Sequence, residues 1–142
     1  MKKALVLLSL LGVFGIANAG DMAVDGYTGL TWQDNKEIVD NLYTYDKAYK
    51  YCDALVLGGH DDWRIPKIAE LLSLVNYLKY KPAIINGFNV VDDRFYWSST
   101  IFKGDTIKNW GVDFKDGTSS GNGISYDRRV RCVRVTNPTK IK

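Results

Sequence analysis

Metal-binding and redox-active residues are scarce in this sequence. Its 142 residues include one histidine, His60, and two cysteines that do not form a Cys-x-x-Cys motif. A zinc site or a redox-active cysteine pair is therefore poorly supported. Phosphate-binding loops, nucleophile elbows, metal-helix motifs and paired-carboxylate motifs are missing as well. These absences predict a non-enzymatic protein without a cofactor or a metal, in which His60 is a surface or loop residue.

The sequence also lacks an apolar run long enough to span a membrane. Its longest run covers residues 4–16, about 13 residues, whereas a membrane-spanning helix needs about 20. Lys2 and Lys3 precede the run, and Ala17-Asn18-Ala19 supplies the small residues that a signal peptidase accepts. We therefore expect residues 1–19 to be a cleavable signal peptide rather than an anchor. The processed protein would be periplasmic or secreted, without a transmembrane anchor.

Without residues 1–19, the chain has almost equal numbers of basic and acidic residues. Lys2 and Lys3 leave with that segment, so 17 basic residues remain against 16 acidic ones. A nearly neutral domain has no overall field that attracts a polyanion, and nucleic acid is therefore not expected as a partner. No repeat or proline-rich linker divides residues 20–142, which fit a single domain.

Two apolar patterns with helical spacing follow an expected hairpin at residues 22–32. Thr44 is a candidate N-cap for the first helix, which is expected to end at Gly58-Gly59. The inner face of this helix is predicted to contain Ala48, Cys52, Leu55 and Val56. Pro66 suits the first turn of the second helix, whose apolar positions are Ile68, Leu71, Leu72 and Val75.

The rest of the chain is a long loop followed by strands. Residues 76–94 have weak periodicity and several turn residues, so a long loop region is expected there. Candidate strands cover residues 95–100, 108–114, 118–126 and 129–135, with a hairpin turn at 115–117. Two helices followed by antiparallel strands indicate an α+β fold.

The two cysteines, Cys52 and Cys132, are expected to form a disulfide because an exported protein folds in an oxidising compartment. Cys52 lies on the inner face of the first helix and Cys132 on the last candidate strand, so the bond would join the two ends of the domain. It closes a loop of about 80 residues, which is worth about 4 kcal/mol in the chain-entropy model. Two free buried thiols are the alternative.

The connector between the helices, Asp61-Asp62-Trp63-Arg64-Ile65-Pro66, is the densest chemical cluster. Asp62 and Arg64 could act as a binding or acid–base pair. The favoured interpretation is structural, with an Asp–Arg contact and a buried tryptophan that fix the turn between the helices. By similar reasoning, Trp97 is expected in the core of a central strand over residues 96–100, whose hydroxyls are paired locally rather than offered to a ligand.

Charged side chains in the loops and on the last strand are the candidate ligand-binding residues. A calcium site would need oxygen donors, but those available lack the fixed spacing of a calcium loop: Asp92, Asp93, Asp105, Asn109 and Asp113. Arginines gather at residues 128–134, where they either hold a sulfated sugar, lipopolysaccharide or an acidic partner, or keep a solvated edge strand from aggregating. The candidates are Asp92, Asp93, Arg94, Lys103, Asp105, Lys108, Arg129 and Arg131.

Six segments, in order along the chain, resemble the successive motifs of one known family. They are residues 28–34, residues 48–55 around Tyr51-Cys52, residues 59–71 from Gly59 to Glu70-Leu71, Tyr96-Trp97-Ser98-Ser99-Thr100, Trp110-Gly111-Val112-Asp113-Phe114 and Val130-Arg131-Cys132-Val133-Arg134. Together they resemble the Lcl C-terminal domain, a domain of unknown function named after the Legionella collagen-like protein. The resemblance extends from about residue 25 to residue 135.

The resemblance implies a C-type lectin-like fold, with two helices beside a twisted antiparallel sheet and a disulfide from the first helix to the last strand. The structural residues of its motifs are here Asp62, Trp63, Arg64, Pro66, Trp97 and Trp110. The namesake is part of an adhesin and binds sulfated glycans, which implies an extracellular or envelope binding module. This sequence departs from the family at Lys67, where a Thr or Ser usually caps the second helix. It also lacks the tripeptides of calcium-dependent lectins.

These patterns predict an exported, non-enzymatic binding module that recognises a glycan or a protein at the cell envelope. A hydrolase is one alternative, because glycosidase carboxylates carry no short signature. It would need two of the loop carboxylates, Asp92, Asp93 or Asp105, to converge in a pocket about 5 to 9.5 Å apart. A structural envelope protein, or a subunit of a larger assembly, is another alternative and would show a contiguous exposed aromatic patch.

Overall fold

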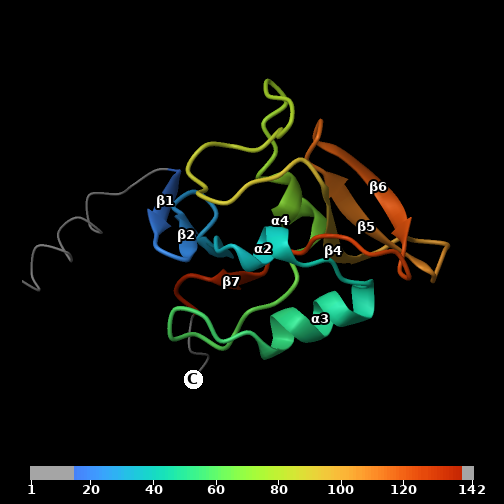
Figure 1. Cartoon of the computed structure of the whole chain (residues 1–142), viewed down its shortest axis with the longest axis horizontal. Helices are drawn as coiled ribbons and strands as arrows, with labels where there is room; N and C mark the ends of the chain where they lie inside the picture. The colour runs from blue at the N-terminus through green and yellow to red at the C-terminus, as the bar shows by residue number, and fades with distance from the viewer. Residues whose placement is uncertain (1–14, 139–142) are drawn as a thin grey trace, which may run out of the picture.

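The computed structural model describes residues 15–138, which form two antiparallel sheets and three helices (Figure 1). The first sheet has the strand order β1-β2-β3-β7, with bounds Ile16–Ala19, Met22–Asp25, Leu30–Gln33 and Val133–Val135. The second has the order β4-β5-β6, with bounds Phe95–Ile101, Lys108–Asp113 and Thr118–Gly123. The helices are α2 (Glu37–Asp40), α3 (Tyr45–Ala54) and α4 (Ile68–Leu72). This mixture of helix and antiparallel sheet confirms the predicted α+β class.

The predicted hairpin at residues 22–32 is present as β2 and β3. Asp25 closes its turn, because its carboxylate accepts hydrogen bonds from the Tyr27 backbone N–H (2.9 Å) and from the Thr28 hydroxyl (2.8 Å). Gly29 then adopts a φ of +71°, a conformation that costs a glycine little. Local turn chemistry is therefore enough to account for this hairpin.

β1 is a strand that the sequence patterns did not predict. Its residues, Ile16–Ala19, pair antiparallel with β2 and cover the outer edge of that strand. The Asn18 side-chain amide donates a 2.8 Å hydrogen bond to the Asp34 carboxylate. These four residues end the segment that we expect to be a signal peptide, and the structure is that of the chain before any cleavage. The earlier part of that segment lies outside the described residues.

The second sheet agrees with the predicted strands to within a few residues at each end. Asp113 pairs with Thr118, which confirms the hairpin turn at residues 115–117. The last strand, in contrast, begins later than predicted. Arg129 donates its N–H to the Phe95 carbonyl (3.1 Å) and accepts from the Trp97 N–H (3.0 Å), so this stretch runs beside β4. The C-terminal segment thus crosses from the second sheet to the first, where it becomes β7.

α3 confirms the first predicted helix but ends at Ala54, before the predicted Gly58-Gly59 stop. Ala48 and Cys52 are buried as predicted, whereas Val56 is 71% exposed. The expectation for Val56 was wrong because the residue follows the end of the helix and does not share its inner face. The short α2 was not predicted. No helix within residues 15–138 has the length and apolarity needed to cross a membrane.

The N-terminus of α4 shows how the chain compensates for Lys67. Two of the helix's first N–H groups find acceptors elsewhere, because a lysine side chain cannot accept a hydrogen bond. The Lys67 N–H donates to the Glu70 carboxylate (2.8 Å), and the Ile68 N–H donates to the Thr100 hydroxyl (3.0 Å). Thr100 belongs to β4, so the missing local cap is replaced by one from the neighbouring sheet.

Two groups of buried side chains hold these elements together. The first joins both sheets to α2 and α4 and contains Leu30, Trp32, Ile38, Leu71, Leu74, Ile84, Tyr96, Val112, Phe114 and Val133. The second surrounds the disulfide and contains Ala48, Cys52, Trp63, Ile65, Trp97, Val130 and Cys132. The Trp97 indole N–H donates to the Tyr43 carbonyl (2.9 Å), so this residue has the predicted core position with its polar atom satisfied.

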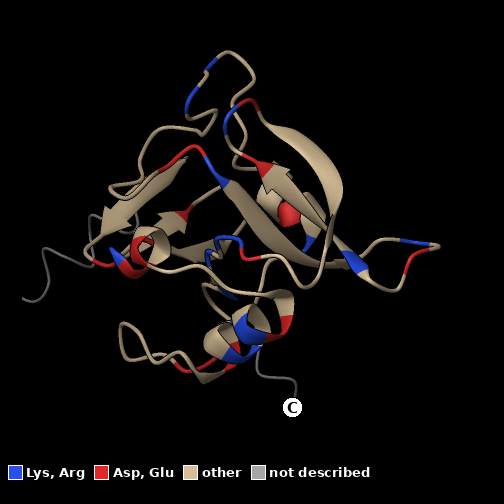
Figure 2. Ribbon diagram, turned by 45° about the vertical axis from the view of Figure 1, so that its right-hand side comes forward, with Lys and Arg blue, Asp and Glu red and all other residues tan. Residues whose placement is uncertain are grey.

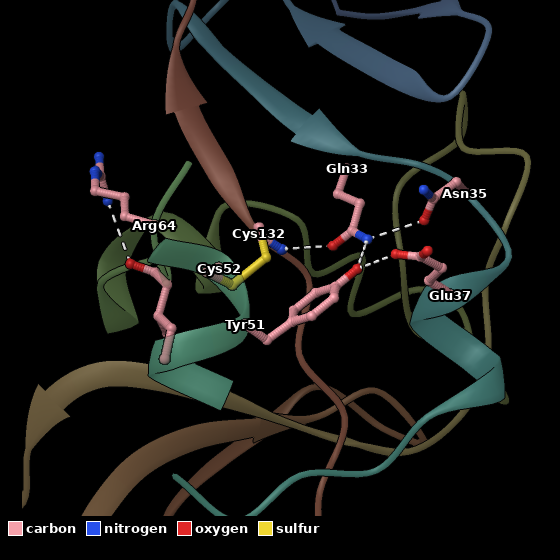
Figure 3. The surroundings of a disulfide bond; sticks show 8 residues. Gln33, Asn35, Glu37, Tyr51, Cys52, Arg64 and Cys132 are labelled. Carbon is pink, nitrogen blue, oxygen red and sulfur yellow. Dashed lines mark hydrogen bonds between the residues drawn. A yellow bond between two sulfur atoms is a disulfide. The ribbon is translucent and has the colours of Figure 1, made fainter. Parts of the chain in front are cut away.

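The disulfide joins Cys52 in α3 to Cys132, the residue before β7, and thereby confirms the predicted pairing. Figure 3 shows how Gln33 links it to the rest of the domain. The Gln33 side-chain oxygen accepts from the Cys132 N–H (3.2 Å), and its amide donates to the Tyr51 hydroxyl (2.7 Å). Tyr51 donates in turn to Glu37, and burial together with this carboxylate raises the pKa of Tyr51. The disulfide, α2, α3 and β3 therefore share one network.

Replacing both cysteines by alanine should lower the free energy of unfolding by about 4 kcal/mol. The bond closes an 80-residue separation in the unfolded chain, and the chain-entropy model gives about this value for such a loop. Urea unfolding of the wild-type protein and of the double variant measures the difference. A loss smaller than about 1 kcal/mol would show that the disulfide does not hold the two ends of the domain together.

Candidate functional site

A groove of about 780 Å³ lies beside the second sheet. One face of β6 lines it, since Thr118, Ser120 and Asn122 alternate along that strand. The remaining lining residues come from the loop before β4 and the start of that strand, from the end of β5, from the segment before β7 and from three other loops: Asp93, Arg94, Phe95, Asp113, Asp127, Arg128, Arg129, Leu42, Lys81 and Lys115. Five of the lining side chains are basic and three are acidic, so the groove carries a small excess of positive charge.

Arg128 is the best-positioned cation of this groove. Its Nε and one terminal nitrogen donate to the Asn122 side-chain oxygen (3.0 and 2.8 Å), and the other terminal nitrogen donates to the Asp127 carbonyl (3.0 Å). The guanidinium also lies 5.7 Å from the Phe95 ring centroid and 5.1 Å from that of Tyr126. These contacts fix its orientation by cation–π attraction and hydrogen bonding.

The charge of Arg128 is nevertheless not neutralised. Within residues 15–138 it forms no ion pair with a carboxylate, and its three hydrogen bonds use three of five N–H donors. Arg94 also lines the groove, and its exposed guanidinium makes neither a hydrogen bond nor an ion pair in the described part of the chain. Of the three guanidinium groups in the groove, that of Arg128 is thus oriented without an ion-pair partner, and that of Arg94 has no partner among the described residues.

Arg129, a predicted candidate, lines the same groove but has a partner. Its Nε donates to the Asp92 carboxylate (2.9 Å), and a terminal nitrogen donates to the Asn41 carbonyl (2.9 Å). The Tyr96 hydroxyl donates to the other Asp92 oxygen (2.6 Å), and burial raises the pKa of Tyr96. Asp92 and Arg129 therefore form a neutral pair that connects the loop before β4 to the C-terminal segment.

The other predicted candidates fall into two places. Asp93 and Arg94 line the groove. Lys103, Asp105 and Lys108 lie away from it, at the connection between β4 and β5, where Lys108 and Asp105 form a 3.5 Å ion pair. The structure therefore brings together only part of the predicted set.

Arg131 has to be corrected as a candidate ligand-binding residue, because its side chain is only 2% exposed. One terminal nitrogen donates to the Gln33 carbonyl (2.7 Å) and lies 3.4 Å from the Asp34 carboxylate, and the other donates to the Val90 carbonyl. Asp34 also accepts the backbone N–H groups of Asn89 and Val90 (both 2.9 Å). This buried pair fastens the long loop to the first sheet.

The predicted Asp62–Arg64 contact is not formed. Arg134 donates to Asp62 (2.6 Å), a bond that lowers the pKa of Asp62, and Arg64 makes a bidentate pair with Glu70 (2.7 and 2.8 Å). The structural interpretation of this connector still fits, since Trp63 is buried and both charged residues hold other elements in place. Of the remaining motif residues, Pro66 is buried and Trp110 packs against Phe102 at 4.8 Å between ring centroids.

The oxygen donors considered for calcium or for catalysis are spread over several places, although Asp93 and Asp113 both line the groove. Within residues 15–138 no three histidine, cysteine or acidic side chains are grouped so that they could hold a metal ion. Of the three carboxylates named for a hydrolase, Asp93 lines the groove, Asp92 is paired with Arg129, and Asp105 is paired with Lys108.

The sequence patterns missed Arg128 as an individual candidate, together with Lys81, Lys115 and the polar face of β6. A local signal for Arg128 did exist. Tyr126 lies two residues before Arg128, and an aromatic ring and a guanidinium so close along the chain can form a cation–π contact, as they do here. The lysines had no such signal, because they reach the groove only through the packing of two loops.

The fold and the site define the class of protein. It is an α+β domain closed by a disulfide, with a polar, partly basic groove beside its second sheet. The Lcl C-terminal domain matches residues 21–134, and the chain belongs to this family. The resemblance found in the sequence motifs is thereby confirmed. No curated protein matches the chain.

The two types of arginine should respond differently to substitution. Arg131→Gln leaves Asp34 buried without its cation, and breaking such a pair costs about 3 kcal/mol or more. Arg94→Gln removes an exposed side chain without a partner in the described residues and should change the free energy of unfolding by less than about 0.5 kcal/mol. Denaturant unfolding measures both. Equal losses for the two variants would contradict the assignment of Arg131 to the core.

Because of the Arg64–Glu70 pair, the difference in stability between the wild-type protein and Glu70→Gln should depend on pH. Burial, the largest single influence, raises the pKa of Glu70, but the hydrogen bonds from Arg64 and from the Lys67 N–H, together with the positive charges of both residues, lower it below its ordinary value of 4.5. A lowered folded-state pKa contributes stability above pH 4.5 that is lost as the pH falls through the folded value. Glu70→Gln should therefore be destabilised by about 1 kcal/mol at pH 7, and its difference from wild type in the free energy of unfolding should shrink as the pH falls from 4.5 through the folded-state pKa.

A matched control for this experiment is Asp46→Asn. Asp46 also forms an ion pair, with Lys50, but both side chains are 73% exposed. Such a surface pair contributes little, and the variant should stay within about 0.5 kcal/mol of wild type across the pH range. If the Glu70→Gln difference stays constant from pH 7 to pH 3, its origin is not the ionised carboxylate.

Proposed function

We propose that the protein is a non-enzymatic binding domain whose groove holds an anionic or sulfated glycan. The observation that carries the proposal is Arg128, an oriented guanidinium in the groove whose charge has no carboxylate partner among residues 15–138. Charged groups that are held in place before binding lose little conformational entropy when a ligand arrives. A sulfate or carboxylate on a sugar can accept the donors that Arg128 and Arg94 leave free.

The remainder of the groove supports a carbohydrate over a simple anion. Hydroxyl and amide side chains of β6, at Thr118, Ser120 and Asn122, offer both donors and acceptors to sugar hydroxyls. Phe95 supplies an apolar ring beside them. The acidic members Asp93 and Asp127 add acceptors and keep the groove selective, because they repel a ligand with too dense a negative charge.

We also propose a C-type lectin-like fold and export with cleavage after Ala19. The disulfide supports export, since such bonds persist in oxidising compartments, and its path from α3 to the residue before β7 supports the fold. Cleavage at this site would remove β1 from the first sheet and leave β2 as its edge. Intact-mass measurement of the exported protein tests the site directly, and a mass that retains Ile16–Ala19 would contradict it.

Substituting Arg128 should weaken ligand binding without unfolding the domain. Hydrogen bonds to a charged group contribute about 1.5 to 3 kcal/mol, so Arg128→Gln should weaken binding of a sulfated oligosaccharide by about 10- to 100-fold. Calorimetric titration at low and high salt measures the affinity, which should fall as salt rises.

Lys103→Gln is the matched control, since Lys103 is an exposed cation outside the groove. It should bind like wild type. Equal losses for Arg128→Gln and Lys103→Gln would show non-specific charge attraction, and the absence of binding by the wild-type protein to every acidic glycan of a screen would contradict the proposal.

A further inference from the structure

Three large side chains of the loop from Asn76 to Pro82 are exposed to solvent. Tyr77 is 72% exposed, Leu78 97% and Tyr80 61%. In Figure 1 this loop projects from the body of the domain next to the turn between β5 and β6. Large apolar side chains gathered on one projecting loop are typical of a surface that meets another apolar phase.

The loop is held in this shape by its own hydrogen bonds. The Leu78 N–H donates to the Asn76 side-chain oxygen, and the Lys79 N–H donates to the Asn76 carbonyl (both 3.0 Å). At its base, the Asn76 N–H donates to the Ala83 carbonyl (3.0 Å), and the Lys81 N–H donates to the Lys115 carbonyl (2.9 Å). The exposed side chains are thus presented by an ordered tip, and inserting them requires little further ordering of the backbone.

The β5–β6 turn supports the loop from one side. A side chain at Gly117 would place its Cβ 2.4 Å from the Val75 Cγ1 and 3.2 Å from the Tyr77 ring, so only glycine permits this approach. The contact brings the backbone of Lys115 beside the loop base. The two segments therefore form one rigid projection.

The loop carries only basic charges, and the turn beside it adds one lysine and one aspartate. Lys79 and Lys81 belong to the loop, Lys115 lies beside it, and Figure 2 shows blue segments but no red one along the loop itself. The nearby carboxylate of Asp116 is engaged by the Thr118 N–H and hydroxyl (3.0 and 2.8 Å) in its own turn. An apolar tip flanked by lysines is complementary to a surface that is apolar inside and anionic outside.

We propose that this loop docks the protein on an anionic lipid surface, with Leu78 entering the acyl boundary, Tyr77 and Tyr80 at the headgroup level, and the lysines on the lipid phosphates. Tyrosine suits the membrane–water boundary because its ring is apolar and its hydroxyl is polar. A projecting tip reaches a bilayer without needing a matching pocket, whereas a protein partner would have to provide one. Lys81 and Lys115 also line the groove, whereas Leu78 and Lys79 do not, so these last two residues test the loop separately from the ligand held in the groove.

Co-sedimentation with vesicles tests this proposal on the whole exported protein. The probes are vesicles of phosphatidylethanolamine and phosphatidylglycerol, compared with vesicles of phosphatidylcholine alone. Wild type should bind the anionic vesicles and bind the zwitterionic ones at least tenfold more weakly. Leu78→Ser should weaken anionic binding about tenfold or more, as expected for losing a buried aliphatic side chain. Lys79→Gln, at a loop lysine outside the groove lining, should weaken it about fivefold, since one lysine near such a surface contributes about 1 kcal/mol.

Val56→Ser is the matched control, because Val56 is also apolar and 71% exposed but lies on another loop. It should bind vesicles like wild type, and all three variants should unfold at the wild-type denaturant midpoint. Arg128→Gln should keep its vesicle affinity, which separates failure of this proposal from failure of the groove assignment. Equal vesicle binding by Leu78→Ser and Val56→Ser would overturn the proposal. So would a wild-type protein that binds neither kind of vesicle. A wild-type dimer in solution that Leu78→Ser converts to a monomer would also overturn it.

Discussion

The position of one short segment, residues 128–134, is the constraint on which the rest of the structure depends. The disulfide fixes Cys132 against α3, and the backbone on either side pairs with different sheets. Arg129 bonds beside β4, whereas Val133 belongs to β7 beside β3. This single segment therefore holds the two sheets together, and its alternating side chains point into both buried groups, Val130 and Cys132 into one and Val133 into the other.

The course of residues 128–134 also determines which partner each arginine of this segment has. A cation that leaves water has to be paired, because the cost of desolvating an isolated charge is large. Arg131 is paired with Asp34, Arg134 with Asp62 and Arg129 with Asp92. Among the described residues Arg128 has no such carboxylate, although it is fixed by hydrogen bonds and two aromatic rings. That contrast separates the arginines that build the domain from the one that we assign to a ligand.

Much of the fold could be predicted because its signals are local. The β2–β3 hairpin follows from turn residues, and α3 follows from the spacing of Ala48 and Cys52. β1 and α2 could not be predicted, since each has four residues and depends on tertiary pairing instead of a pattern. The candidate site was only partly predictable for the same reason. Charge alone could not distinguish Arg131 from Arg128, because the difference lies in which elements cover each side of the segment.

The central claim is that Arg128 meets a ligand in the groove while Arg131 and Arg134 do not. Side-chain Nε–H signals of the arginines, followed by NMR during titration with a sulfated disaccharide, test it most directly. The account predicts that the Arg128 signal and the backbone amides of β6 shift with the added sugar, while the Arg131 and Arg134 signals stay in place. Shifts confined to the connection between β4 and β5, or signals that remain unchanged at millimolar sugar, would contradict it.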